Sequence, residues 1–426
     1  MFQIIKNKLE KLGCDAWELT ETLTDSWEFY FIRHQLDQNR AVETRTFDVK
    51  VYRLLEDGKF LGSASGEISP TASEAEIDKV LKDLLFQAGL VKNPAYTLTD
   101  TPVNGLPEAV MPAPVDMAGA FLSAMQHLPE TKTEDINSYE IFVRGKTRHF
   151  CNSRGVEARV SWPDSMLEVV INARDDEKEI ELYRNFTSGI CDEKTLEAEI
   201  ARAMQFGRDR LTAVPTPRAD GIPVIFSTSD ACSIYEYFAD RTNAAYKVQK
   251  ISPWEIGAPV AEDLQGDRIS LEALPELPGS SRNIPVDSEG CRISERFLIR
   301  DGVAEHFWGS RQFSEYLGLA DSSQVYNFRV SGGTHSEQDL RQGDYLELVE
   351  FSDFQVDSMG GDIAGEIRLG YLHRGGKVTV VTGGSVTGSM TEAVSTMQCS
   401  EEQKQYDTMV IPAVTKLFGL RITSVE

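Results

Sequence analysis

Two carboxylates and a phenol lie close together in a short stretch with helical character, Ile234-Tyr235-Glu236-Tyr237-Phe238-Ala239-Asp240. Glu236 has the chemistry of a general base, but the stretch contains no histidine. Zinc prefers imidazole and thiolate ligands, and the neutral phenol of Tyr235, with an ordinary pKa of about 10, is a poor substitute. These residue types argue against a tight zinc site here, and ordinary helix packing explains Tyr235, Tyr237 and Phe238 equally well.

The histidines and cysteines form no known catalytic or metal-binding motif. The six histidines are scattered, and neither HExxH nor GxSxG occurs. His306 alternates with two aromatic residues as in a packed or surface strand, whereas His335 lies in a predicted loop. The six cysteines contain no CxxC pair, which excludes a zinc knuckle and a disulfide framework and favours a reducing, cytoplasmic compartment.

Composition indicates an ordinary globular protein. A chain of 426 residues predicts two or three domains. The balance of 43 basic against 67 acidic residues gives a net charge of −24, which disfavours binding to nucleic acid. The charged, amphipathic N-terminus is not a signal peptide, and no apolar run reaches the roughly 18 residues of a membrane span.

A strand-to-helix unit occurs twice in the first half of the chain. Ser65-Gly66 precedes Glu74-Ala75-Glu76-Ile77, and Ser188-Gly189 precedes Glu197-Ala198-Glu199-Ile200, with nine positions from glycine to alanine in both cases. Strand-like segments come before each unit and an amphipathic helix after it. Ser73 and Glu76 have the spacing of a capping box. We therefore expect duplicated strand-helix units, although similar helix starts can also arise by chance.

The middle of the chain contains two breaks. Five prolines form a connection between the two units, followed by a short helix near 116–128: Pro94, Pro102, Pro107, Pro112 and Pro114. A second break at Pro215-Thr-Pro217-Arg-Ala-Asp-Gly221 predicts a domain boundary. We expect an α+β fold, with an N-terminal α+β domain over 1–215 and a mostly antiparallel, β-rich C-terminal domain over 216–426. In the second domain, Asp301-Gly302 and Gly375-Gly376 indicate hairpin turns, since no phosphate-binding glycine motif occurs.

The chain resembles the TldD/PmbA family, also called the modulator-of-DNA-gyrase family, nearly from end to end. The blocks that carry the resemblance are Val51-Tyr52, Gly62-Ser63-Ala64-Ser65, Ile68-Ser69-Pro70, Asn152-Ser153-Arg154-Gly155-Val156, Pro285-Val286-Asp287-Ser288-Glu289-Gly290, Leu298-Ile299-Arg300-Asp301-Gly302 and Met397-Gln398-Cys399. The resemblance implies dimers, in which a zinc-bearing TldD-type subunit typically pairs with a PmbA-type subunit without zinc ligands. Together such subunits cleave unfolded or leader peptides.

The family's zinc ligands can be carried over position by position. Zinc-bearing members use HExxxH and a distant cysteine, which correspond here to Tyr235, Glu236, Asp240 and Cys399. The resemblance therefore implies a PmbA-type subunit with a degenerate site, no metal and no other cofactor. Its partners would be a second copy or a zinc-bearing relative, together with unfolded peptide held by strand addition, but neither nucleic acid nor membrane.

Two alternatives remain. In the first, the chain is a self-sufficient metallopeptidase whose metal is held by Cys399, Asp240 and Glu236. In the second, it is a homodimeric peptide-binding protein without a protease partner.

Overall fold

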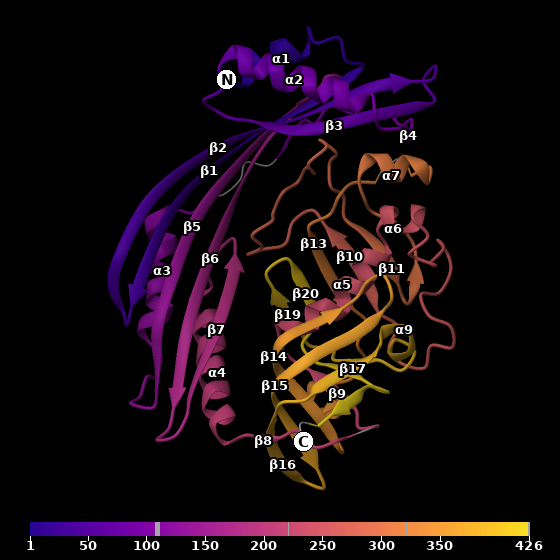
Figure 1. Cartoon of the computed structure of the whole chain (residues 1–426). Coiled ribbons are helices and arrows are strands. Elements are labelled where there is room, and N and C mark those ends of the chain that lie inside the picture. The colour runs from indigo at the N-terminus through magenta and orange to yellow at the C-terminus, as the bar shows by residue number, and fades with distance from the viewer. Residues whose placement is uncertain (107–110, 220, 320–321, 425–426) are drawn as a thin grey trace.

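The computed structural model describes residues 1–106, 111–219, 221–319 and 322–424. Its N-terminal half is built on a long, curved antiparallel sheet with strand order β4-β3-β2-β1-β5-β6-β7 (Figure 1). The strands are β1 (Ala16–Ile32), β2 (Gln35–Leu55), β3 (Phe60–Ile68), β4 (Asn93–Pro94), β5 (Glu134–Asn152), β6 (Glu157–Arg174) and β7 (Glu179–Ser188). β1 and β2 form one long hairpin, in which a two-residue turn at Arg33 and His34, both with positive φ, joins the two strands.

Four helices cover this sheet: α1 (Phe2–Leu9), α2 (Glu74–Ala88), α3 (Pro114–Gln126) and α4 (Glu193–Thr212). α3 begins two residues before its predicted start at 116. The capping box of α2 is confirmed, since the Ser73 hydroxyl accepts from the Glu76 backbone N–H and the Glu76 carboxylate accepts from the Ser73 N–H at 2.8 Å. Pro107 lies outside the described residues.

The duplication is confirmed as β1-β2-β3-α2 followed by β5-β6-β7-α4. Leu19 pairs directly with Cys151 beneath α2, and Phe31 pairs directly with Tyr139 in the cluster beneath α3 and α4. The β1–β5 register is continuous between these pairs, so all four side chains point to one face of the sheet. The two helices therefore cover the same face at opposite ends. The matched tetrapeptides differ in place, because 74–77 opens α2 whereas 197–200 lies one turn inside α4.

The C-terminal half contains two sheets, with strand orders β12-β11-β10-β13-β20-β19 and β18-β21-β9-β14-β15-β16-β8. The strands are β8 (Val214–Pro215), β9 (Val224–Phe226), β10 (Ser270–Leu274), β11 (Arg296–Arg300), β12 (Val303–Ala304), β13 (Asn327–Ser331), β14 (Tyr345–Val356), β15 (Asp362–Arg374), β16 (Lys377–Thr382), β17 (Ser385–Ser389), β18 (Gln398–Cys399), β19 (Gln403–Tyr406), β20 (Met409–Pro412), β21 (Thr415–Leu417) and β22 (Arg421–Thr423). Most pairs are antiparallel, as predicted.

The C-terminal helices are short: η1 (Ser229–Ala231), α5 (Cys232–Arg241), α6 (Ala244–Val248), α7 (Arg311–Tyr316), α8 (Glu337–Leu340) and α9 (Met390–Ala393). α5 and α6 are separate helices, because the Asn243 side chain accepts from the Ala245 N–H and caps a new helix. Within the described residues, no helix is long and apolar enough to cross a membrane.

The division near 215–221 stays a prediction. β8 precedes it but pairs with β16 of the C-terminal half, and Asp220 lies outside the described residues. Val349 and Leu369 of the C-terminal half share a buried cluster with α4. The two halves are therefore joined by a buried apolar cluster in which Val349 and Leu369 pack with residues of α4.

Candidate functional site

Tyr235 and Cys399 lie together in the apolar core of the C-terminal half. The Tyr235 hydroxyl lies 3.3 Å from Cys399 Sγ and 2.7 Å from Thr415 Oγ1. Cys399 and Thr415 face one another on β18 and β21, and α5 places the tyrosine against both. All three side chains are fully buried. The structure therefore brings together two of the four predicted site residues, with Thr415 as a third member that the sequence did not indicate.

Burial keeps this trio protonated. It raises the pKa of Tyr235 well above its ordinary value and that of Cys399 to about 12. The Cys399 backbone N–H donates to the Asp267 carboxylate at 2.6 Å, which fixes the cysteine at its strand position. A thiol and a phenol that retain their protons and bond to one another are not a zinc-binding set.

Glu236 and Asp240 face away from the trio's hydrogen bonds. Asp240 accepts from Ser358 Oγ at 2.7 Å, and burial raises its pKa. Burial and the neighbouring Asp240 carboxylate raise the pKa of Glu236. Among the described residues, no hydrogen bond or ion pair joins either carboxylate to Tyr235 or Cys399, and no group of three histidine, cysteine or acidic side chains has the arrangement of a metal site. The residues at these positions therefore do not fit zinc.

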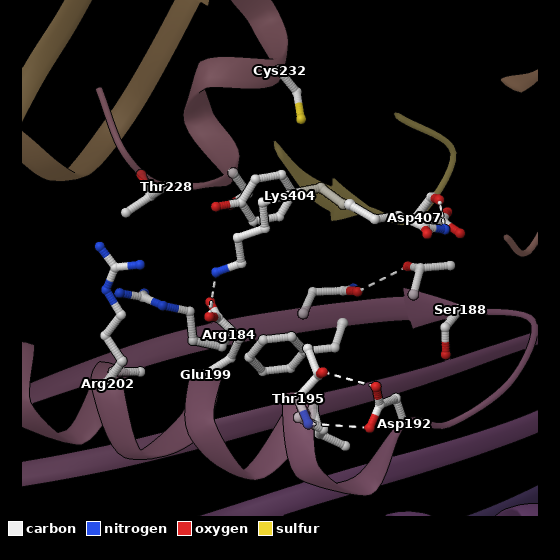
Figure 2. Close-up of a pocket in the computed structure, with 18 of the residues that line it drawn as sticks. Arg184, Ser188, Asp192, Thr195, Glu199, Arg202, Thr228, Cys232, Lys404 and Asp407 are labelled. Atoms are coloured by element: carbon white, nitrogen blue, oxygen red, sulfur yellow. Dashed lines mark hydrogen bonds and ion pairs between the residues drawn. The ribbon is translucent and has the colours of Figure 1, made fainter. Parts of the chain in front are cut away.

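A large cleft lies between the two halves, on the side of α5 where the helix begins (Figure 2). Its volume is about 1010 Å³, and it is bounded by β7, α4, η1, the middle of β14 and β19. Aromatic and apolar side chains make up much of its wall: Phe121, Tyr183, Phe186, Ile190, Phe206, Val349 and Phe351. Tyr183 and Ile190 are more than half exposed, at 53% and 55%, which leaves apolar surface available at this cleft.

Two strand edges border this cleft. β7 is the last strand of the seven-stranded sheet, and β19 is the last strand of the six-stranded sheet. Residues 183–188 of β7 and 403–406 of β19 line the same cavity. An edge strand presents unpaired backbone N–H and C=O groups on its outer side. At one end of the cleft the two halves meet through the backbone, where the Gly189 N–H donates to the Gly279 carbonyl at 2.8 Å.

Half of the charged side chains that line the cleft form ion pairs. Arg184 of β7 and Glu350 of β14 form an ion pair at 3.0 Å across the two halves. Lys404 of β19 pairs with Glu199 of α4, and Figure 2 shows this contact between Lys404 and the helix. These pairs hold the two walls together without filling the cavity.

The degenerate site lies directly behind the cleft wall. Cys232, the first residue of α5, lines the cleft, and Tyr235 follows three positions later in the same helix. Burial raises the pKa of Cys232 above its ordinary value. Neither His306 nor His335 lines the cleft. Sequence reasoning did not find the cleft, because its walls come from segments that are far apart in the chain.

The C-terminal half has a recognisable family. Residues 219–423 match the family model described as the PmbA/TldA metallopeptidase C-terminal domain. This part of the chain is therefore similar to the C-terminal domain of the PmbA/TldD family. Metalloprotease PmbA of Escherichia coli O157:H7 is 26% identical over 145 residues, which are 33% of this chain and 32% of that protein. The aligned segment thus spans about a third of that relative's length.

A likeness to solved structures extends over the whole chain. The crystal structure of TldE from Thermococcus kodakarensis superposes with a TM-score of 0.77 at 16% identity, and the match covers 99% of each chain. At that level of identity the likeness concerns the fold alone. The matched family model describes a metallopeptidase domain, whereas two of the positions that the resemblance assigns to zinc ligands hold Tyr235 and Cys399. These two side chains bond to one another, and Tyr235 also bonds to Thr415.

Proposed function

We propose that this chain binds extended, unfolded peptide in the cleft between β7 and β19, as a subunit without its own zinc in a peptidase assembly. The observation that carries the proposal is that the unpaired edges of two different sheets border one cleft of about 1010 Å³. A free edge strand exposed to solvent promotes aggregation unless it is covered or charged. An edge that faces a cleft is a template for an incoming strand.

Strand addition accounts for the mixture of backbone edges and apolar walls. Main-chain hydrogen bonds to an edge strand bind any extended sequence, and alternate side chains of the peptide enter lateral pockets. Here the pockets would be formed by Phe186 and Phe206 on one wall and Phe351 on the other. Such a site favours unfolded segments with scattered apolar residues over a single defined sequence.

The zinc chemistry would come from a partner. The name Metalloprotease PmbA, given to the Escherichia coli relative, supports a role in proteolysis. In zinc peptidases the metal lowers the pKa of its bound water and polarises the scissile carbonyl. Tyr235 and Cys399 offer a protonated phenol and thiol in place of such a site. We therefore expect a homodimer, or a heterodimer with a zinc-bearing family member, in which this chain holds the peptide.

N-methylated peptides test strand addition without altering the protein. Methylating alternate backbone nitrogens of a six-residue peptide removes the N–H groups on one edge of the extended chain, and the complementary set serves as a matched control. We expect one of the two sets to bind at least about tenfold more weakly than the unmodified peptide, because each lost bond contributes about 1 kcal/mol. Equal binding of both sets and the unmodified peptide would contradict strand addition.

Cleavage assays test the assembly. An unstructured peptide is incubated with the chain alone, with the Glu236→Gln variant, and with the chain plus a zinc-bearing family member. We expect cleavage only when the partner is present, since a general base alone supplies about 10²–10⁴-fold, whereas enzymes supply 10⁶-fold or more. Robust cleavage by the chain alone that Glu236→Gln abolishes would favour a self-sufficient peptidase.

A further inference from the structure

Among the described residues, no acidic side chain forms an ion pair with Arg202 of α4. Its guanidinium reaches the Ser227 carbonyl at 3.4 Å and the Ser227 hydroxyl at 3.3 Å, and it lies 5.3 Å from the centre of the Phe206 ring. The ion pairs of the described residues include those of Arg184 and Lys404 but none of Arg202. Figure 2 places Arg202 beside Thr228, at the end of the cleft opposite Ser188.

Tyr406 supplies a hydrogen-bond donor to the same cavity. Its hydroxyl is buried and has no hydrogen-bond partner among the described residues, and its side chain lines the cleft. Burial raises its pKa above the ordinary value, the nearby Glu199 carboxylate adds to this effect, and the positive charge of Arg202 opposes it. A buried phenol without a partner is costly unless a ligand or water completes its bonding.

The arrangement of α4 and β19 explains why Arg202 and Tyr406 line the same cavity. The Lys404–Glu199 pair lays β19 against α4. Tyr406 follows Lys404 by two positions, on the same side of the strand, and the Lys404 ammonium lies 5.0 Å from the centre of the Tyr406 ring. Arg202 follows Glu199 by three positions, on the same side of the helix. Arg202 and Tyr406 are therefore carried by elements that the ion pair holds in place.

We propose that Arg202 and Tyr406 bind a carboxylate of the extended peptide and so fix its position in the cleft. This inference rests on the proposed function. The planar guanidinium matches a carboxylate with two parallel hydrogen bonds, and the phenol donates a third. The Asp230 carboxylate of the adjacent wall accepts from Thr228 at 3.2 Å. Burial raises the pKa of Asp230, and the hydrogen bond from Thr228 opposes this effect.

The carboxylate can belong to the peptide's C-terminus or to an acidic side chain, and three synthetic peptides separate these sources. The probe is a six-residue peptide, Ser-Val-Thr-Ser-Val-Ala, labelled with fluorescein at its N-terminus and measured by fluorescence anisotropy. It is prepared as the free acid, as the C-terminal amide, and as the amide with glutamate in place of the second valine. We expect at least one acidic form to bind about tenfold more tightly than the neutral amide.

Variants connect that preference to the proposed residues. Arg202→Gln should remove the preference for the acidic form while affinity for the neutral amide stays within about twofold. Tyr406→Phe should reduce the preference about threefold, since a single hydrogen bond to a charged group is lost. Arg202→Lys keeps the charge without the planar fork and should retain part of the preference. Arg374→Gln, at an exposed turn remote from the cleft, is the matched control.

The outcomes distinguish this inference from the function on which it rests. If the wild-type chain binds none of the three peptides, the peptide cleft is wrong and the carboxylate site falls with it. If it binds all three equally, the peptide cleft stands and the carboxylate site is wrong. A preference for the acidic form that survives Arg202→Gln would also overturn the assignment.

Discussion

The two strand-helix units of the N-terminal half share one layout but differ at their outer strands. In the first unit, β4 pairs with the start of β3, and the end of α2 closes over Gly62, where a Cβ atom would lie 1.9 Å from the Ala88 carbonyl oxygen. In the second unit, β7 keeps a free edge along the cleft. The difference indicates that one copy of the unit supports the fold while the other presents a template.

The two units also differ in how they contact the C-terminal half, because the first borders a small cavity and the second a large cleft. The first unit meets the loop at 285–291 around a cavity of about 340 Å³ with acidic walls. Glu18 on β1 is 8% exposed and accepts from the Tyr52 hydroxyl at 2.7 Å, and the fully buried Asp287 accepts from the backbone N–H groups of Glu289 and Cys291. The second unit meets the C-terminal half across the much larger cleft.

The largest effect should come from closing space in the first unit. Gly62→Ala would place a methyl group against the backbone of Ala88 and Val91, which cannot move as a side chain can. We expect a loss of about 3 kcal/mol or more in the free energy of unfolding, measured by chemical denaturation. Gly119→Ala, at an exposed position of α3 with nothing within 4 Å of the new Cβ, should instead gain about 0.5–1 kcal/mol. If Gly62→Ala destabilised the protein no more than a typical surface substitution, α2 would not pack tightly over Gly62.

The next effect is a pH dependence that belongs to the first unit. Burial raises the pKa of Glu18 to about 7, against the opposing hydrogen bond from Tyr52. Because the folded state then binds the proton more tightly than the unfolded state, stability is full below the ordinary pKa near 4.5 and falls as pH rises through 7. The fall attributable to Glu18 should be on the order of 2–3 kcal/mol between pH 4.5 and 7.5.

Glu18→Gln should remove that part of the decline. The remaining slope would include the contribution of Asp287, whose pKa burial raises to about 6. Glu67→Gln, on the exposed side of β3, serves as the control and should leave the wild-type slope unchanged. If the free energy of unfolding depended on pH in the same way in wild type and Glu18→Gln, the pKa of Glu18 would be the same in the folded and unfolded states.

An intermediate effect should arise behind the cleft, at the degenerate site. Tyr235→Phe removes a hydroxyl that contacts Thr415 and Cys399 in a fully buried position. We expect a loss of about 1–3 kcal/mol in the free energy of unfolding, because two buried polar groups lose their common partner. Tyr246→Phe, a partly buried tyrosine of neighbouring α6, is the matched control and should cost less than about 1 kcal/mol. Equal losses of stability in Tyr235→Phe and Tyr246→Phe would show that the hydrogen bonds among Tyr235, Cys399 and Thr415 do not stabilise the fold.

Local signals in the sequence were informative, whereas contacts between distant segments were not. The capping box at Ser73 and the hairpin at Asp301-Gly302 depend on neighbouring residues alone, and both occur as predicted. The pairing of Tyr235 with Cys399 was anticipated only through the family resemblance. The cleft depends on contacts such as Lys404 with Glu199, 205 positions apart, and no periodic pattern encodes such a contact. Arg202 and Tyr406 stand out only in the folded structure, which shows that the described residues provide no ion pair for Arg202 and no hydrogen bond for the Tyr406 hydroxyl.

The smallest effects come from the helix caps, and they test the division of roles between the two units most directly. Ser73 caps α2 in the first unit, and Asp192 caps α4 by accepting from the Thr195 N–H at 3.2 Å, while also lining the cleft. Ser73→Ala and Asp192→Ala should each cost about 1 kcal/mol in the free energy of unfolding. Peptide affinity should stay unchanged in Ser73→Ala and fall about twofold in Asp192→Ala, because only the second change loosens a helix turn at the cleft wall. Denaturation curves and anisotropy titrations on the same two variants measure both quantities. If Ser73→Ala weakened peptide binding as much as Asp192→Ala, the first unit would be part of the binding surface and the contrast between the units would be lost.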